Sequence, residues 1–292
     1  MKKDTIRELV VLSGKGGTGK TSITASFAVL AEHAVLADCD VDAADLHLLL
    51  TPHVEQRHDF FSGREAIIDP LECTGCGLCL DVCRFDALRT NGTDYWVDPV
   101  GCEGCGVCVR FCAAKAIDFP ERQCGEWMQS TTRCGPMVHA HLGVAAENSG
   151  KLVATVREQA LKLAVDRQFP LIISDGPPGI GCPVIASLSG VSLALVITEP
   201  SLSGLHDLQR VLALARHFSV PTVVCVNKWN INPRLAERIE AAALSAGAAI
   251  TGRIRYDRAV TQAQLQRKAV VEMDAAVAGD IRLVWQQISQ ML

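Results

Sequence analysis

Residues 10–21 read Val10-Val11-Leu12-Ser13-Gly14-Lys15-Gly16-Gly17-Thr18-Gly19-Lys20-Thr21. They form an apolar run, a glycine-rich turn and a helix start, with the spacing G-x-x-x-x-G-K-[ST] of a phosphate-binding loop from Gly14 to Thr21. Glycines let backbone N–H groups wrap closely around phosphates, and the N-terminus of a helix adds partial positive charge at the same place. The stretch therefore predicts a nucleotide site rather than a plain flexible loop.

Side chains near this loop divide into phosphate and metal ligands. We expect Lys20 to neutralise the β- and γ-phosphates and the hydroxyl of Thr21 to ligate Mg²⁺. Asp175 ends an apolar run, which is a Walker B arrangement that would hold Mg²⁺ through water, and the N–H of Gly179 would reach the γ-phosphate. The nucleotide-binding residues predicted up to this point are Gly14, Gly16, Gly17, Thr18, Gly19, Lys20, Thr21, Ser22 and Gly179.

Apolar runs alternate with amphipathic segments along most of the chain. Strands are expected at 6–12, 34–37, 170–175, 192–200, 221–228 and 248–254, and helices at 21–33, 151–168, 207–217, 233–246 and 280–292. This order predicts an α/β fold with a doubly wound, mostly parallel sheet that binds its ligand beyond the carboxyl ends of the strands. The last helix has one basic residue, Arg282, so it is expected to pack on the body rather than to bind a membrane.

Composition and charge limit the partners and the cellular location that we expect. The 292 residues are 49% hydrophobic and carry a formal net charge of −4, which argues against a nucleic-acid partner. We expect a cytoplasmic location because no run is long enough to span a membrane and no apolar segment follows the N-terminus. Thirteen cysteines in such a protein point to metal or redox chemistry rather than disulfides.

Eight of these cysteines form two matching blocks with a period of 29 residues, Cys73-x₂-Cys76-x₂-Cys79-x₃-Cys83 and Cys102-x₂-Cys105-x₂-Cys108-x₃-Cys112. Each block is the bacterial ferredoxin pattern, in which the fourth cysteine ligates the other cluster. Two [4Fe–4S] clusters are therefore expected, one on Cys73, Cys76, Cys79 and Cys112 and the other on Cys102, Cys105, Cys108 and Cys83. Two zinc sites are the alternative, although zinc prefers separated C-x₂-C pairs.

The blocks divide the chain into three segments. Residues 1–61 and 120–292 are expected to form one P-loop ATPase domain, and residues 62–119 a small inserted α+β ferredoxin domain. Among the other cysteines, Cys39 and Cys225 belong to apolar strands and are expected in the core.

The loop Gly14–Thr21 resembles the deviant Walker A motif of the MinD/ParA/Mrp class, whose mark is the additional lysine at Lys15. The resemblance implies ATP and ADP as ligands and an ATP-dependent homodimer in which Lys15 reaches the phosphates of the partner. Segments 38–42 and 175–179 resemble the two switches of the class, which implies that Asp40 positions the attacking water. Catalytic roles thus go to Lys15, Lys20 and Asp40, and the likeness makes Asn227 and Asp257 contacts of the base.

Cys182 follows the second switch at an offset similar to that of the cluster ligand in the nitrogenase iron protein. A bridging cluster at a dimer interface is one interpretation, and a small buried cysteine is the default.

The whole pattern resembles MinD-type ATPases with an inserted ferredoxin domain. We expect ATP hydrolysis to drive a dimer switch coupled to electron transfer through the two clusters, toward a redox or metallocofactor protein. One alternative is an assembly ATPase for iron–sulfur or other metallocofactors, which the lack of a C-x-x-C pair outside the insert disfavours. The other is a MinD-like positioning or scaffold ATPase, which the weakly basic last helix disfavours.

Overall fold

The structure is a computed structural model that describes residues 6–143 and 149–292. The chain divides into two compact units. The larger unit contains the described residues up to His58 together with Trp127–His141 and Ser149–Leu292, and the smaller contains Asp59–Glu126 with Leu142 and Gly143. Residues 1–5, on which the expectation of a missing signal peptide partly rests, lie outside the described ranges.

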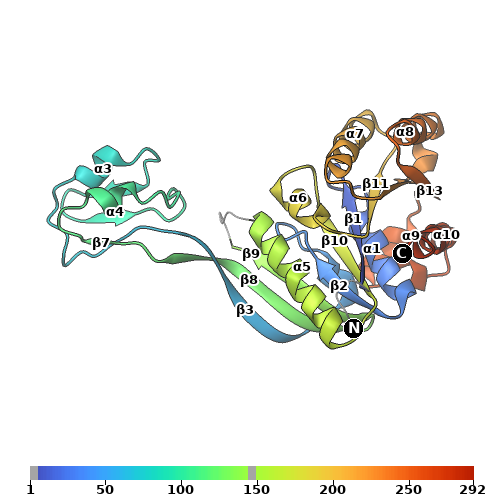
Figure 1. Cartoon of the computed structure of the whole chain (residues 1–292), viewed down its shortest axis with the longest axis horizontal. Coiled ribbons are helices and arrows are strands. Elements are labelled where there is room, and N and C mark those ends of the chain that lie inside the picture. Colours follow the sequence, from blue (N-terminus) through green and yellow to red (C-terminus); the bar gives the residue numbers. More distant parts are fainter. Residues whose placement is uncertain (1–5, 144–148) are drawn as a thin grey trace. The chain divides into compact units, whose positions relative to one another are not determined.

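The larger unit is built on a mostly parallel sheet (Figure 1). Over the described residues it has nine strands in the order β13-β12-β11-β1-β10-β2-β9-β8-β3. Parallel pairing joins β13 to β12, β12 to β11, β11 to β1, β1 to β10, β10 to β2 and β2 to β9. The strands are β1 (Arg7–Ser13), β2 (Ala34–Asp38), β3 (His53–Arg64), β8 (Glu121–Thr132), β9 (Gly135–Leu142), β10 (Leu171–Pro178), β11 (Leu193–Thr198), β12 (Thr222–Asn227) and β13 (Ala249–Ile254).

Both faces of the sheet are buried, because successive side chains of a strand point to opposite faces and helices cover each face. In β1, Leu9 and Val11 join one apolar cluster, whereas Val10 and Leu12 join another. The helices of this unit are α1 (Lys20–Ala31), α2 (Leu46–Leu50), α5 (Ser149–Asp166), α6 (Cys182–Leu188), α7 (Leu202–His217), α8 (Pro233–Ser245), α9 (Ala259–Leu265) and α10 (Ala276–Ser289), with short 3₁₀ turns η2 (Trp229–Ile231) and η3 (Val270–Glu272). The doubly wound α/β fold that the sequence predicts is confirmed.

The ends of two helices differ from their predicted positions. Helix α7 starts at Leu202 rather than 207, because Ser201 caps it by accepting a hydrogen bond from the N–H of Gly204. Helix α10 starts at Ala276 rather than 280 and buries its apolar face, with Trp285 against Phe27 of α1 at 5.1 Å between ring centroids. Packing of the last helix on the body is therefore confirmed, and no described helix is long and apolar enough to cross a membrane.

Three strands at one end of the sheet, β9, β8 and β3, were not predicted. Their apolar positions are irregular: β3 is mostly exposed, so the alternation that identifies a half-buried strand is missing. The strands β8 and β9 are neighbours joined by the two residues Arg133 and Cys134, as in a β-hairpin.

The smaller unit repeats one pattern twice. Helices α3 (Leu78–Val82) and α4 (Val107–Phe111) are offset by the same 29 residues as the cysteine blocks, and each follows a glycine with positive φ, Gly77 at 75° and Gly106 at 71°. Two antiparallel pairs complete it, β4 (Ile67–Ile68) with β7 (Ile117–Asp118), and β5 (Leu88–Thr90) with β6 (Tyr95–Val97).

Candidate nucleotide site and cysteine unit

The phosphate-binding loop lies between the carboxyl end of β1 and the start of α1. Gly19 is the residue before α1 and has φ 90°, a conformation that glycine adopts without strain. A side chain there would also collide with the amide of Asn227, and one at Gly14 would collide with Asp207 of α7. These two glycines are therefore required by close approach as well as by the motif.

Lys20 is buried between two carboxylates. Its Nζ lies 2.9 Å from Oδ1 of Asp175 and 3.3 Å from Oδ2 of Asp40, and only 5% of the residue is exposed. Burial alone would lower the pKa of Lys20, but the attraction of Asp175 and Asp40 outweighs burial and raises it. The three residues come from the loop and both predicted switches, so the fold brings together what the sequence assigned to one site.

The environment of Asp175 fits a bound Mg²⁺. Its Oδ1 accepts hydrogen bonds from Lys20 and from Thr24, whereas its buried Oδ2 has no hydrogen-bond partner among residues 6–143 and 149–292. Thr21, the other predicted ligand, is partly buried in the first turn of α1. A hydroxyl and a carboxylate are the hard oxygen donors that Mg²⁺ prefers alongside water and phosphate.

Asp38 holds the first switch through hydrogen bonds. The sequence placed it in this segment but assigned it no individual role. Its carboxylate accepts the N–H of Asp40 at 3.3 Å and the N–H of Leu46, at the start of α2, at 3.2 Å. Burial, and the negative charge of Asp175, raise the pKa of Asp38 well above its usual value. Burial also raises the pKa of Asp40, against the opposing effect of Lys20.

The second switch is closed onto the strand that carries the loop. Gly179 has φ 93°, and its N–H donates to the carbonyl of Ser13 at 2.9 Å. The predicted contact of this N–H with the γ-phosphate therefore requires the bond to Ser13 to break. Such an exchange is the kind of movement by which nucleotide switches respond to the γ-phosphate.

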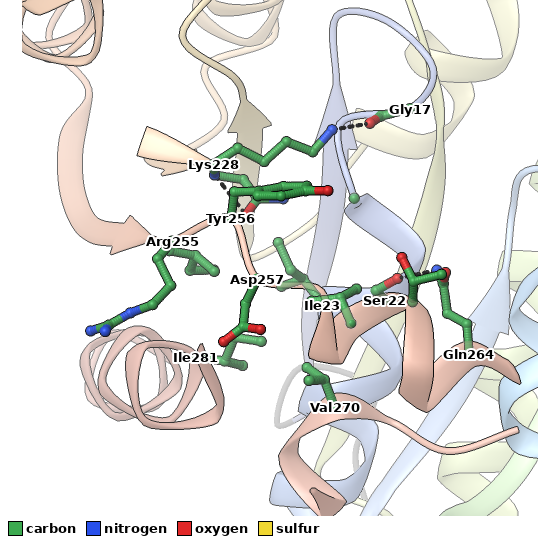
Figure 2. Close-up of a pocket in the computed structure, with 15 residues that line it drawn as sticks. Gly17, Ser22, Ile23, Lys228, Arg255, Tyr256, Asp257, Gln264, Val270 and Ile281 are labelled. Carbon is green, nitrogen blue, oxygen red and sulfur yellow. Dashed lines mark hydrogen bonds between the residues drawn. The ribbon is translucent and has the colours of Figure 1, made fainter. Parts of the chain in front are cut away.

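A pocket of about 230 Å³ continues from the loop toward the ends of β12 and β13. Asn227 and Asp257, the two predicted base contacts, both line it. The amide of Asn227 donates to the carbonyl of Thr18 at 2.7 Å, so this side chain also holds the loop. Figure 2 shows two further ties, Lys228 to the carbonyl of Gly17 and Gln264 to Ser22, at 2.8 Å each.

The wall of this pocket is itself anchored. The guanidinium of Arg255 binds both carboxylate oxygens of Asp280 in α10, at 2.7 and 2.8 Å, and the N–H of Tyr256 donates to Asn230 at 2.6 Å. These contacts hold the segment that contains Asp257 beside the loop.

Lys15 does not point away from the chain toward a partner in this structure. Its Nζ contacts Oε1 of Glu199 at 2.7 Å and the hydroxyls of Ser203 and Ser201 at 2.9 and 3.2 Å. The sequence reasoning missed Glu199 and Lys228, although both occupy positions at the carboxyl ends of parallel strands, where ligands of this fold bind. That position is the signal that could have identified them.

Eight cysteines of the smaller unit belong to the two predicted ligand sets. Cys73, Cys76, Cys79 and Cys112 line one pocket. In the other group, burial raises the pKa of Cys108, and the nearby charges of Cys102, Cys105 and Cys83 raise it further. Among the described residues, no three or more His, Cys, Asp or Glu side chains form a group that could hold a metal ion.

The predicted burial of three other cysteines can be compared with the structure. Cys39 and Cys225 are buried, as predicted. The default prediction for Cys182 is wrong, because this residue is exposed at the first position of α6. The buried apolar residues of α6 are Val184 and Leu188, further along the helix, and its first residue lies on the surface.

Comparison with known proteins gives a family and a fold. Residues 9–270 match the model described as the CobQ/CobB/MinD/ParA nucleotide binding domain. An uncharacterized protein of Methanocaldococcus jannaschii, MJ0578, is 35% identical over 230 residues, which cover 78% of this chain and 80% of that protein. MinD of Pyrococcus horikoshii with Mg-ADP is a similar structure, with a TM-score of 0.58 and 17% identity over 98% of this chain and 97% of that one. The MinC:MinD cell division complex of Aquifex aeolicus has a TM-score of 0.58 and 16% identity, covering 97% of this chain and 96% of that chain.

Proposed function

Because the chain belongs to the CobQ/CobB/MinD/ParA family of nucleotide-binding domains, we propose that it binds and hydrolyses ATP as the switch of a homodimer. The observation that carries this proposal is the buried charge cluster of Lys20, Asp175 and Asp40 at the end of the phosphate-binding loop. In the absence of phosphate, the carboxylates supply the negative charge that Lys20 needs. Phosphate oxygens would replace them and release Asp40 and Asp175 for chemistry.

The residues then have distinct tasks. Lys20 and the loop N–H groups bind the phosphates, and Thr21 and Asp175 would hold Mg²⁺, which would supply positive charge to the phosphates. Asp40, freed from Lys20, accepts a hydrogen bond from the attacking water and fixes its direction. Asn227 and Asp257 hold the base in the pocket beside the loop.

Lys15 is the residue that makes hydrolysis depend on a second copy. We assign it to the phosphates of the partner, as its family signature implies, so that a complete site exists only in the ATP-bound dimer. The output of such a switch is a surface present in one nucleotide state and absent in the other. We therefore place the protein with MinD-like ATPases whose dimer presents a binding surface to a protein partner.

Two variants test this assignment. Lys20→Ala is expected to abolish binding of ATP and ADP, measured by calorimetry. Lys15→Ala is expected to retain both affinities but to lose hydrolysis and the doubling of mass that ATP causes in light scattering. Equal hydrolysis rates for Lys15→Ala and the wild type would remove the shared site from the proposal.

We also propose that the smaller unit holds two [4Fe–4S] clusters on the cysteine groups predicted from sequence. The support is the pocket formed by Cys73, Cys76, Cys79 and Cys112, because the last of these comes from the other block.

Bound clusters would supply one-electron chemistry, and the dimer switch would then couple ATP hydrolysis to electron transfer toward a redox partner. Without that coupling, the switch serves the MinD-like scaffold role given above or an assembly role. The discriminating measurement is the reduction potential of the clusters with and without ATP and Mg²⁺, on anaerobically purified protein. A potential that ATP does not shift, together with ATP-dependent recovery of a partner that contains no redox centre, would assign the scaffold role.

A further inference from the structure

The ammonium of Lys15 is fully satisfied within its own chain. A lysine has three N–H donors and no acceptor. Three oxygens lie around the Nζ of Lys15, at 2.7 Å from Glu199, 2.9 Å from Ser203 and 3.2 Å from Ser201. One acceptor is charged and two are neutral, so the group resembles a small binding site for an ammonium.

This group of acceptors is rigidly held. Glu199 directly follows β11, and Ser201 and Ser203 belong to the cap and first turn of α7. Ser201 also accepts the N–H of Gly204, which fixes the position of its hydroxyl. On the other side, Gly14 packs so closely on Asp207 of α7 that a side chain would not fit, so the loop that carries Lys15 is seated on the same helix.

Glu199 also binds a second lysine of the nucleotide site. Its Oε2 lies 3.1 Å from the Nζ of Lys228, which donates to the carbonyl of Gly17 in the loop at 2.8 Å. Burial raises the pKa of Glu199, but hydrogen bonds from Lys15 and Lys228 outweigh burial and lower it. One carboxylate therefore stays ionised while it contacts two lysines beside the phosphate-binding loop.

We propose that Glu199 is a positioning residue that stores Lys15 inside its own chain until an ATP-loaded second copy offers its phosphates. This inference rests on the proposed function, because it needs Lys15 to act in the partner. Dimer formation then exchanges one Glu199 carboxylate for phosphate oxygens in each chain. The retention of Lys15 by Glu199 sets how much ATP and how high a protein concentration are needed before the dimer forms.

Glu199→Gln tests whether Glu199 retains Lys15, and it changes the shape of the side chain little. The amide oxygen of glutamine still accepts a hydrogen bond, but the charge that retains Lys15 is gone. A partly exposed ion pair contributes modestly, so the loss of each contact should favour release about two- to fivefold. Because a twofold dimer loses the contact in both chains, the dimer dissociation constant should fall about 4- to 25-fold with a non-hydrolysable ATP analogue.

Glu240→Gln is the matched control. Glu240 pairs with Arg253 at 2.6 Å, with side-chain exposures of 18% and 32% that nearly equal the 21% and 30% of Glu199 and Lys15. It lies on α8 and contacts neither the loop nor the switches. This variant should leave the dimer dissociation constant unchanged.

ADP separates storage of Lys15 from a change in the pocket. ADP has no γ-phosphate for the lysine of a partner, so release of Lys15 by itself leaves ADP affinity unchanged, whereas a disturbance of Lys228 and the loop shifts it. A tighter ATP dimer with unchanged ADP affinity supports the proposal. An unchanged or weaker dimer in a folded Glu199→Gln chain overturns it, and so does an equal shift in ADP affinity.

Failure of the proposed function gives a different result. If neither the wild type nor Glu199→Gln dimerises with the ATP analogue while both bind it, the shared site itself is wrong, and the proposed role of Glu199 is rejected with it. If the wild type dimerises and Glu199→Gln dimerises no more tightly, only the proposed role of Glu199 is rejected. Light scattering over a range of protein concentrations, with thermal unfolding as a check on folding, distinguishes these outcomes.

Discussion

Removal of the Lys20 ammonium should strongly destabilise the nucleotide-free protein. In Lys20→Ala, the carboxylates of Asp175 and Asp40 lose the cation that lies 2.9 and 3.3 Å away. At an effective dielectric constant of about 20, each attraction is about 5–6 kcal/mol before the cost of burying Lys20 is subtracted. Breaking a buried pair on one side typically costs about 3–5 kcal/mol, and we expect that loss of unfolding free energy near neutral pH.

In Lys20→Ala the unpaired carboxylates can become neutral by binding protons. The loss of unfolding free energy therefore cannot exceed the free energy of protonating them, and it depends on pH. The pKa values of Asp38 and Asp40 are already raised, and they should rise further without Lys20. The folded variant then binds more protons than its unfolded chain, so its stability falls as pH rises. Protonating a carboxyl with an unfolded pKa of about 3.9 costs about 5 kcal/mol at pH ~7.5 and about 2 kcal/mol at pH ~5.5.

Urea unfolding followed by circular dichroism at these two pH values measures the difference from wild type. Lys162→Ala is the control, because Lys162 pairs with Glu158 on an exposed surface of α5, and its removal should cost at most about 0.5 kcal/mol. The double variant Lys20→Ala/Asp175→Asn should recover part of the stability, since one unpaired charge is removed. A Lys20→Ala chain within about 1 kcal/mol of wild type at pH ~7.5, or a difference that does not shrink at pH ~5.5, would refute the reasoning.

Three further predictions concern the base, the switch and the cysteines. Asn227→Ala leaves the carbonyl of Thr18 without its donor and should weaken ATP and ADP binding about tenfold in calorimetry, whereas Asn91→Ala, in the turn before β6 of the smaller unit, should not. Asp40→Asn should keep ATP binding and ATP-dependent dimerisation but lose most hydrolysis, and full hydrolysis would remove Asp40 from the water-positioning role. Cys76→Ser and Cys105→Ser should each lower the iron content of anaerobic protein from about eight to about four atoms per chain. Cys225→Ser, at a buried position in β12, should leave iron unchanged, and zinc in the wild-type preparation would contradict the cluster assignment.

The phosphate-binding loop and the cysteine blocks were predictable because their chemistry is written in contiguous residues. The spacing of glycines, lysine and threonine from Gly14 to Thr21 can be read without knowing the rest of the fold. The strand and helix order was predictable for the same reason, since the continuous apolar runs within 7–13 and 193–198 are local features. The added strands β3, β8 and β9 were not predicted, because their pattern of burial is set by neighbours and not by their own periodicity.

The sequence by itself determined the family motif, the parallel α/β architecture and which residues were predicted to bind the phosphates. Only the tertiary structure decided which side chains those residues contact. Lys15 meets Ser203 across 188 positions of sequence, and Lys20 meets Asp175 across 155. Such pairings depend on which strands lie beside β1 in the sheet, and local sequence does not encode that order. The physical reason is that a charged side chain takes the nearest opposite charge the fold offers, so the resting partners of both lysines are properties of the assembled sheet.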